Sequence, residues 1–265
     1  MNPPFTFEHL VAIMRKLRAP GGCPWDAEQT HESLTRYLLE EAYEVIEAID
    51  EKNSLHLKEE LGDLLLQPVF HAAIAEEAGD FSIDDVINTL CEKLIRRHPH
   101  VFGDLEIRDS DAQVENWEKI KKIEKGSERT SALSGIPDHL PALLKAHKIG
   151  EKASRVGFDW EHADQVFAKV MEELHEFEEA WAGGNPTRME DELGDLLFAI
   201  SNLGRFLHLN PEEALRKTIT RFKKRFGYVE TELLRQGVQM QNATLEEMDL
   251  LWEQAKSAER ERKII

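Results

Sequence analysis

The sequence predicts an all-α protein made of two copies of one helical domain, and three observations support this fold class. Leu, Glu, Ala and Lys recur at spacings of three and four residues, as in amphipathic helices, whereas alternating β-branched stretches are scarce. Four sequence blocks of the first half recur in the same order in the second half. With 265 residues, the chain can supply two domains that each bury a core.

The repeated blocks define a duplicated unit of about 130 residues. The best-preserved block reads "EELGDLL" in the first half and "DELGDLL" in the second half, 132 positions later. Between the copies lies a segment, 125–141, whose Gly, Ser and Pro residues cannot prolong a helix. We therefore predict one domain over 1–130 and a second domain over 131–265. The matching blocks are 38–48 with 170–180, 59–65 with 191–197, 93–102 with 221–230, and 114–122 with 248–256.

Charge and composition exclude several classes of partner. The chain has 33 basic and 51 acidic residues and a formal net charge of −18, so its field repels nucleic-acid polymers. No stretch approaches the roughly 18 apolar residues of a membrane helix, and no signal-peptide pattern is present. Cys23 and Cys91 suggest neither a disulfide framework nor a zinc site. We expect a cytoplasmic protein without membrane or nucleic-acid partners, in which local cations still admit small phosphate ligands.

The first predicted helix pair carries two pairs of acids. Glu41 and Glu44 are three residues apart in one helix, which places their Cβ atoms about 5–6 Å apart on one face. Glu60 and Asp63 repeat this spacing in the next helix, after a predicted turn at 50–54. Because Glu44 and Glu60 are equally far from the centre of the turn, an antiparallel hairpin brings the two pairs level.

The second predicted helix pair repeats this arrangement with a clearer break. Glu173 and Glu176 precede the segment "AGGNPT" at 182–187, and Glu192 and Asp195 follow it. The break lies midway between Glu176 and Glu192, as the turn does in the first half. We therefore predict that four carboxylates converge at one level between the two helices.

The apolar neighbours of these acids predict partial desolvation. Leu193, Leu196 and Leu197 are expected to form a buried stripe with the acids on its flank. Carboxylates about 4 Å apart repel by roughly 4 kcal/mol per pair at an effective dielectric constant near 20, and a hard divalent cation with oxygen ligands removes that cost. A single acidic motif of this kind would be interpreted as an ordinary solvated helix face. Its duplication with matched spacing favours a site for Mg²⁺ or Mn²⁺.

Basic and aromatic side chains accompany the second acidic hairpin. Five cations and a tryptophan suit a Mg²⁺-bound polyphosphate that carries an aromatic base. Taken singly, each of these residues is more typical of an ordinary surface or core position, and only the set supports the prediction. The set comprises Lys169, Arg188, Arg221, Arg225, Trp252 and Lys256.

The combined pattern resembles the MazG family of nucleoside triphosphate pyrophosphohydrolases. The resemblance is carried by EExxE followed by ExxD, a basic helix and a W-x-x-x-K helix, all duplicated, and by flanking segments 21–34, 96–102 and 140–160. It implies an all-α fold of the nucleoside triphosphate pyrophosphohydrolase type, a homodimer, and Mg²⁺-dependent hydrolysis of nucleoside triphosphates such as ATP to nucleoside monophosphate and pyrophosphate. It also suggests a role in clearing excess or non-canonical nucleotides.

The resemblance assigns roles to individual residues, mainly in the second half, which is expected to carry the activity. Glu172 or Glu173 would accept the proton of the attacking water. In the first half, Tyr37 and His56 stand at the positions of Lys169 and Arg188; the loss of two cations should weaken triphosphate capture. The implied metal ligands are Glu173, Glu176, Glu192 and Asp195, which together with Glu172 form the predicted catalytic set, and a second metal site is predicted at Glu41, Glu44, Glu60 and Asp63. The implied nucleotide contacts are Lys169, Arg188, Asp191, Arg221, Arg225 and Trp252.

Two other classes of function remain as alternatives. A di-iron carboxylate bundle uses Glu-x-x-His motifs, which "EELH" at 172–175 and "EQTH" at 28–31 match superficially. Against it, Tyr43 replaces His175 in the first copy, Gln29 and Thr30 mark a helix boundary, and the basic set has no role. A non-enzymatic acidic helical adaptor is the other alternative, and it predicts no stabilisation by Mg²⁺ and nucleotide.

Overall fold

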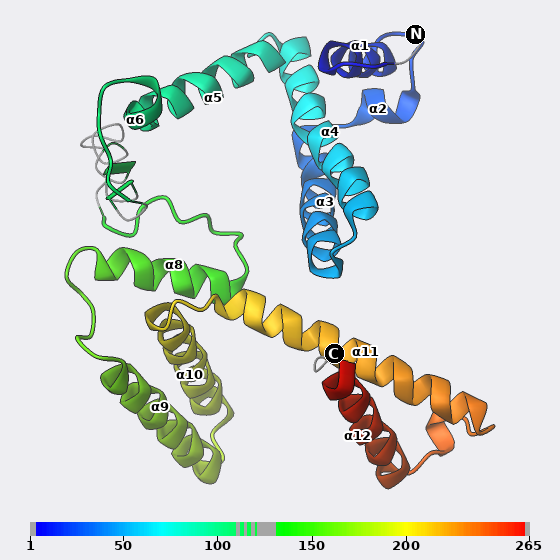
Figure 1. Ribbon diagram of the computed structural model, residues 1–265, viewed down its shortest axis with the longest axis vertical. Helices are drawn as coiled ribbons and strands as arrows, with labels where there is room; N and C mark the ends of the chain where they lie inside the picture. The colour runs from blue at the N-terminus through cyan, green and yellow to red at the C-terminus, as the bar shows by residue number, and fades with distance from the viewer. Residues whose placement is uncertain (1–3, 110–111, 114–115, 118–119, 121–130, 263–265) are drawn as a thin grey trace. The chain divides into compact units, whose positions relative to one another are not determined.

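A computed structural model describes residues 4–109, 112–113, 116–117, 120 and 131–262, and Figure 1 shows the course of the chain. Every regular element within these residues is a helix, which confirms the predicted all-α fold class. The chain separates into two compact units, Met1–Lys125 and Gly126–Ile265. Residues 121–130, where the predicted domain boundary falls, lie outside the described residues. No helix in the described part of the chain is long and apolar enough to span a bilayer.

The first unit is built around a helical hairpin. Its elements are α1 (Phe7–Arg18), α2 (Pro24–Glu28), α3 (His31–Glu51), α4 (Ser54–Ala78), α5 (Ile83–Arg97) and α6 (Pro99–Phe102). Helices α3 and α4 lie side by side in opposite directions, and α1 and α5 pack against α4 (Figure 1). The core joins Met14 of α1, Leu34 of α3, and Val69 and Phe70 of α4.

Local capping explains where the helices of the first hairpin begin and end. The Thr30 side chain accepts a hydrogen bond from the backbone N–H of Ser33 and starts α3. Lys52 ends α3 in the left-handed conformation, with φ of 55°, and the Asn53 side chain accepts two backbone N–H groups from the first turn of α4. The chain therefore reverses within two residues, which confirms the turn predicted at 50–54.

The second unit contains two helical hairpins. Its elements are α8 (Ala142–Ser154), α9 (Ala163–Gly183), α10 (Pro186–Phe206), α11 (Pro211–Arg235), the 3₁₀ helix η2 (Met240–Asn242) and α12 (Leu245–Arg262). Helices α9 and α10 form the hairpin that carries the acids, and α8 packs against α10 (Figure 1). Helices α11 and α12 pack against each other around Val229, Leu233 and Leu251. The turn between α9 and α10 confirms the helix break predicted at 182–187.

Two adjacent glycines at the α9–α10 turn are expected to respond in opposite directions to alanine. Gly184 has φ of 65°, a left-handed conformation that costs an L-residue about 1–2 kcal/mol. Gly183 ends α9, and no heavy atom lies within 4 Å of an added Cβ, so alanine there should stabilise by up to about 1 kcal/mol. Urea unfolding followed by helical circular dichroism should show a lower midpoint for Gly184→Ala and a higher one for Gly183→Ala. Shifts of the same sign would contradict this turn conformation.

The leucines beside the acids are not buried, contrary to the sequence-based prediction. Leu193 and Leu197 are each 45% exposed, and Leu196 is only partly buried, so a buried stripe through these three residues is wrong. The physical reason is that α8 and α9 cover other faces of α10; the Ser201 hydroxyl, for example, donates a hydrogen bond to the Leu143 carbonyl of α8 at 3.1 Å. The buried residues of α10 are Ala199, Ser201 and Asn202.

These leucines belong to a larger exposed surface, the apolar face of the α9–α10 hairpin. On each helix the face includes the residue directly after an acid of the cluster, Leu174 after Glu173 and Leu193 after Glu192. Successive residues of an α-helix are turned by about 100°, so the apolar residues of each helix lie about 100° round the helix axis from its acids. Because the two helices run in opposite directions, these rotations bring both sets of apolar residues to the same side of the hairpin. The apolar face comprises Phe167, Met171, Leu174, Trp181, Leu193, Leu197 and Ile200, all exposed.

Candidate metal and nucleotide site

Three carboxylates from α9 and α10 converge in the second unit. Glu173 is buried, Glu176 and Glu192 are half-buried, and each offers an oxygen within 4.8 Å of the others. Glu173 and Glu176 share a helix face because they are three residues apart, and the hairpin brings Glu192 level with them. Asp195, one turn beyond Glu192, is exposed and does not belong to this group. Its role as a fourth ligand remains a prediction.

The electrostatic state of this group depends on two neighbouring cations. Lys169 Nζ lies 2.7 Å from Glu172 Oε1 and 2.8 Å from Glu173 Oε1, and these carboxylates raise the pKa of the lysine. Arg188 Nε lies 3.4 Å from Glu192 Oε1. Glu176 has no ion pair among the described residues; burial, and then the charges of Glu173 and Glu192, raise its pKa.

A hard divalent cation fits this set of donors. All three side chains supply carboxylate oxygens, the ligand type that Mg²⁺ and Mn²⁺ prefer. Burial is the largest cause of the raised pKa of Glu176, and repulsion by the charges of Glu173 and Glu192 adds to it. A bound cation would relieve this repulsion. Glu173, Glu176 and Glu192 are therefore the residues that would hold the metal.

The first unit contains a related group with different cations. Glu41, Glu60 and Asp63 have oxygens within 4.8 Å of one another, and Glu44 is outside this group. Burial, and then the charges of Asp63 and Glu44, raise the pKa of Glu41. His56 Nε2 lies 3.1 Å from Glu60 Oε1, where the second unit has an arginine beside Glu192. This site therefore keeps its acids but replaces a permanent positive charge with a titratable one.

The predicted phosphate-binding cations of α11 and α12 form a separate group. Arg221, Arg225 and Lys256 line a cavity of about 230 Å³ together with Glu259 and Arg260. The centroid of the Trp252 ring lies 4.9 Å from that of Phe222 and 5.8 Å from the guanidinium carbon of Arg225. No contact described in this structure joins these residues to the carboxylates of α9 and α10.

Comparison with known proteins places the chain in a family. The MazG nucleotide pyrophosphohydrolase domain matches residues 29–102 and 162–229, which include both three-carboxylate groups. The chain belongs to the MazG family. The nucleoside triphosphate pyrophosphohydrolase/pyrophosphatase MazG of Thermotoga maritima is 52% identical to it over 253 residues, which cover 96% of each chain. The nucleoside triphosphate pyrophosphohydrolase of Escherichia coli strain K12 is 43% identical over 256 residues, which cover 95% of this chain and 97% of that protein.

The double match confirms the resemblance to two-domain MazG proteins and shows which parts of the predicted sites the family pattern covers. Each match includes a complete acidic hairpin; the first also includes all of α5, whereas the second ends inside α11. Lys169, Arg188, Arg221 and Arg225 lie inside the second match, whereas Trp252 lies beyond it. Two other predicted residues make few contacts: Glu172 is exposed and bound to Lys169, and Asp191 is exposed without a hydrogen bond or ion pair among the described residues.

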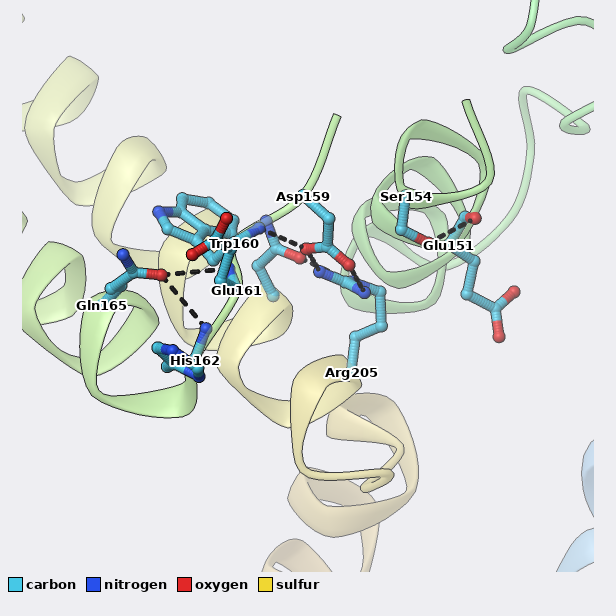
Figure 2. A network of polar contacts seen from close by, with 9 residues as sticks. Glu151, Ser154, Asp159, Trp160, Glu161, His162, Gln165 and Arg205 are labelled. Atoms are coloured by element: carbon cyan, nitrogen blue, oxygen red, sulfur yellow. Dashed lines mark hydrogen bonds and ion pairs between the residues drawn. The ribbon is translucent and has the colours of Figure 1, made fainter. Parts of the chain in front are cut away.

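In this MazG chain an ion pair between Asp159 and Arg205 joins the loop before α9 to the end of α10. This contact was not predicted from the sequence. Arg205, near the end of α10, donates from Nη1 to Asp159 Oδ2 at 3.0 Å (Figure 2). Its Nε donates to Asn202 Oδ1 at 2.7 Å. Asp159 also accepts the Trp160 backbone N–H at 2.9 Å, and the Arg205 guanidinium holds the pKa of its carboxyl below the usual range. The loop before α9 is thus fixed to α10 at the end opposite the turn.

The histidines required by a di-iron arrangement lie away from the carboxylate groups of this MazG chain. His175 Nε2 is 3.5 Å from Glu179 Oε1, and its side chain is largely exposed. His31 Nδ1 is 2.7 Å from His71 Nδ1, and the two rings stack. Neither histidine belongs to a possible metal-binding group among the described residues.

Proposed function

We propose that this MazG chain hydrolyses nucleoside triphosphates to nucleoside monophosphate and pyrophosphate. The reaction would use Mg²⁺ or Mn²⁺, and its main site would be the carboxylate group of the second unit. The convergence of Glu173, Glu176 and Glu192 beside Lys169 and Arg188 carries this proposal. Carboxylates for a metal and cations for phosphates are the two groups that hydrolysis of a metal–nucleotide complex needs. The names of the Thermotoga maritima and Escherichia coli relatives describe the same reaction.

The residues around the acids have distinct roles in the proposed mechanism. Glu173, Glu176 and Glu192 would hold the cation, whose chemistry is to neutralise phosphate oxygens and to lower the pKa of a bound water. Lys169 contacts both Glu172 and Glu173. A phosphate that attracts Lys169 therefore releases a carboxylate, which can accept the proton of the attacking water. Arginine side chains would stabilise the negative charge of the departing pyrophosphate.

We further propose that the first unit contributes little to turnover. Tyr37, at the position of Lys169, is not a cation, and its hydroxyl accepts a hydrogen bond from Arg36. His56, at the position of Arg188, is charged only when protonated. Each lost charge-assisted contact is worth about 1.5–3 kcal/mol. The first site would thus bind a triphosphate much more weakly than the second site.

We also propose a homodimer formed through the apolar faces of the hairpins. Leu193, Leu197 and Ile200 are each more than two-fifths exposed, and Trp181 on α9 is 69% exposed. Contiguous exposed apolar surface of this kind marks interaction sites. Leu61 and Leu65 of α4 occupy the equivalent positions of the first hairpin and are also exposed. A second copy of the chain would supply a matching apolar surface.

We place this activity in the cytoplasm and assign it to the removal of excess or non-canonical nucleotides. Cys23 and Cys91 are both free thiols, as expected in a reducing compartment. Hydrolysis to the monophosphate removes a nucleotide from the triphosphate pool in one step, whichever base it carries.

Product analysis tests the reaction and the ranking of the two sites. Incubation with nucleoside triphosphates and Mg²⁺ should give nucleoside monophosphate and pyrophosphate by ion-exchange chromatography, and nucleotide with Mg²⁺ should raise the melting temperature. Glu192→Gln should abolish turnover, whereas the matched variant Glu60→Gln should retain most of it. Release of nucleoside diphosphate and phosphate would disprove the proposed reaction. Absence of both turnover and stabilisation would support the adaptor alternative, and loss of activity only in Glu60→Gln would reverse the ranking.

A further inference from the structure

The cavity between α11 and α12 is lined in part by Glu259 and Arg260, two residues outside the predicted nucleotide contacts. It is lined by four cations and one acid: Arg221, Arg225, Lys256, Arg260 and Glu259. Although the whole chain is strongly acidic, cations outnumber acids here four to one, so the local field attracts anions. Glu259 and Arg260 lie on α12, beyond the W-x-x-x-K motif.

Arg260 extends a row of side chains along one face of α12. Trp252, Lys256 and Arg260 are four residues apart in turn and therefore share a face. At about 1.5 Å per residue, Arg260 lies roughly 12 Å from Trp252 along the helix axis. An aromatic ring thus stands at one end of the row and a guanidinium group at the other, with a lysine between them. A nucleoside triphosphate has complementary groups in the same order, with an aromatic base at one end and a negatively charged terminal phosphate at the other.

The cations that line the cavity differ in whether an acid already neutralises them. Lys256 Nζ is 2.5 Å from Glu253 Oε1, and Arg225 is bound to Glu259. Arg260 lines the cavity and has no hydrogen bond or ion pair among the described residues. Its guanidinium fork therefore keeps its donors available for two oxygens of a phosphate group.

Glu259 fixes the orientation of Arg225. Its Oε2 accepts hydrogen bonds from Arg225 Nε at 3.0 Å and Nη2 at 2.8 Å. The two side chains are only 22% and 19% exposed, so water competes weakly for this pair. With Nε and Nη2 held from α12, the Arg225 guanidinium stays near Trp252, and Nη1 remains available to a ligand.

We propose that Arg260 binds the terminal phosphate of the substrate and so selects nucleoside triphosphates over diphosphates, and that Glu259 is a positioning residue that holds Arg225 for phosphate binding. This inference rests on the proposed hydrolysis of nucleoside triphosphates. Selection follows because a diphosphate that places its base on Trp252 has no group at the Arg260 end of the row. The full triphosphate reaches both ends.

Arg260→Ala tests the first part of the proposal in the full-length protein. We expect KM for a nucleoside triphosphate to rise about tenfold, the effect of one charge-assisted contact at a partly solvated site. We expect kcat to change less than twofold and Arg260→Lys to recover part of the loss. Calorimetry with tripolyphosphate should show similar weakening, whereas binding of orthophosphate should change little. The control is Arg235→Ala, which removes an exposed arginine of α11 that does not line the cavity.

Glu259→Gln tests the second part of the proposal, because a positioning role and simple electrostatics predict opposite changes in the affinity for tripolyphosphate. Removal of a negative charge from a phosphate site would by itself tighten binding. If Glu259 orients Arg225, tripolyphosphate should instead bind several-fold more weakly, with an unchanged melting temperature and partial recovery in Glu259→Asp. Tighter or unchanged binding would overturn the positioning role.

The outcomes separate this inference from the proposed function. If the wild-type protein hydrolyses nucleoside triphosphates but Arg260→Ala behaves like Arg235→Ala, only the role of Arg260 is disproved. If the wild-type protein hydrolyses no triphosphate, the proposed function fails, and the inference that depends on it fails as well. Tripolyphosphate calorimetry would still show whether Arg260 and Glu259 form an oligophosphate site.

Discussion

Glu176→Gln is expected to lower nucleoside triphosphate hydrolysis by at least about a hundredfold without unfolding the protein. Even residues that only support metal ligands commonly contribute 10- to 100-fold to metal affinity or activity, and Glu176 would itself bind the metal. The substitution keeps the size and helix position of the side chain but removes a charge. Calorimetric titration with Mn²⁺ should show weaker binding in the same variant.

The stability of Glu176→Gln distinguishes a lost metal ligand from a misfolded protein. The pKa of Glu176 is raised, chiefly by burial and by the charges of Glu173 and Glu192, so its ionised form is unfavourable in the folded state. Above that pKa, the neutral glutamine should leave the metal-free melting temperature unchanged or raise it. The matched variant Glu44→Gln changes the equivalent residue of the first hairpin, which lies outside the carboxylate group there, and should remain active. Full activity of Glu176→Gln would contradict the proposed site.

Local sequence signals predicted the hairpins and most of the acidic groups because short-range geometry determines both. The turns at Lys52–Asn53 and Gly184–Asn185 follow from residues that end helices and cap the next ones. Once the turns are known, the three-residue spacing of Glu173 and Glu176 decides which side chains meet across the hairpin. These features need no knowledge of the rest of the protein.

Other features of the site depend on contacts that sequence spacing does not define. Asp63 joins the carboxylate group of the first unit, whereas Asp195, at the equivalent position, stays outside the second group. Asp159 and Arg205 are 46 residues apart and meet only because the loop before α9 returns to the end of α10. Neither outcome follows from helical periodicity, which says nothing about side-chain rotamers or distant pairings.

The exposed leucines show a related limit of pattern-based prediction. Periodicity correctly placed Leu193 and Leu197 on one face, but the chain itself does not cover that face. A residue pattern cannot distinguish an internal core from an interface, because both need the same apolar row on a helix. The proposed homodimer would give these leucines a partner surface.

The double variant Leu65→Asp/Leu197→Asp is expected to convert the proposed dimer into monomers. Each leucine is 45% exposed on the apolar face of its hairpin. Burial of a leucine side chain contributes about 1.5–3 kcal/mol to the free energy of association. In a two-fold symmetric dimer each substitution is present in both copies, so each loss occurs twice. The four losses together should raise the dissociation constant by many orders of magnitude. Sedimentation velocity over a range of protein concentrations measures this change directly.

Leu55→Asp/Leu234→Asp is the matched control, since it adds the same charge at leucines that are still more exposed and that the proposed interface does not include. It should sediment like the wild-type protein. Both double variants should keep their helical circular dichroism, because neither changes a residue buried within its own unit. If Leu65→Asp/Leu197→Asp remained a dimer of unchanged affinity, the leucines would not lie between two copies.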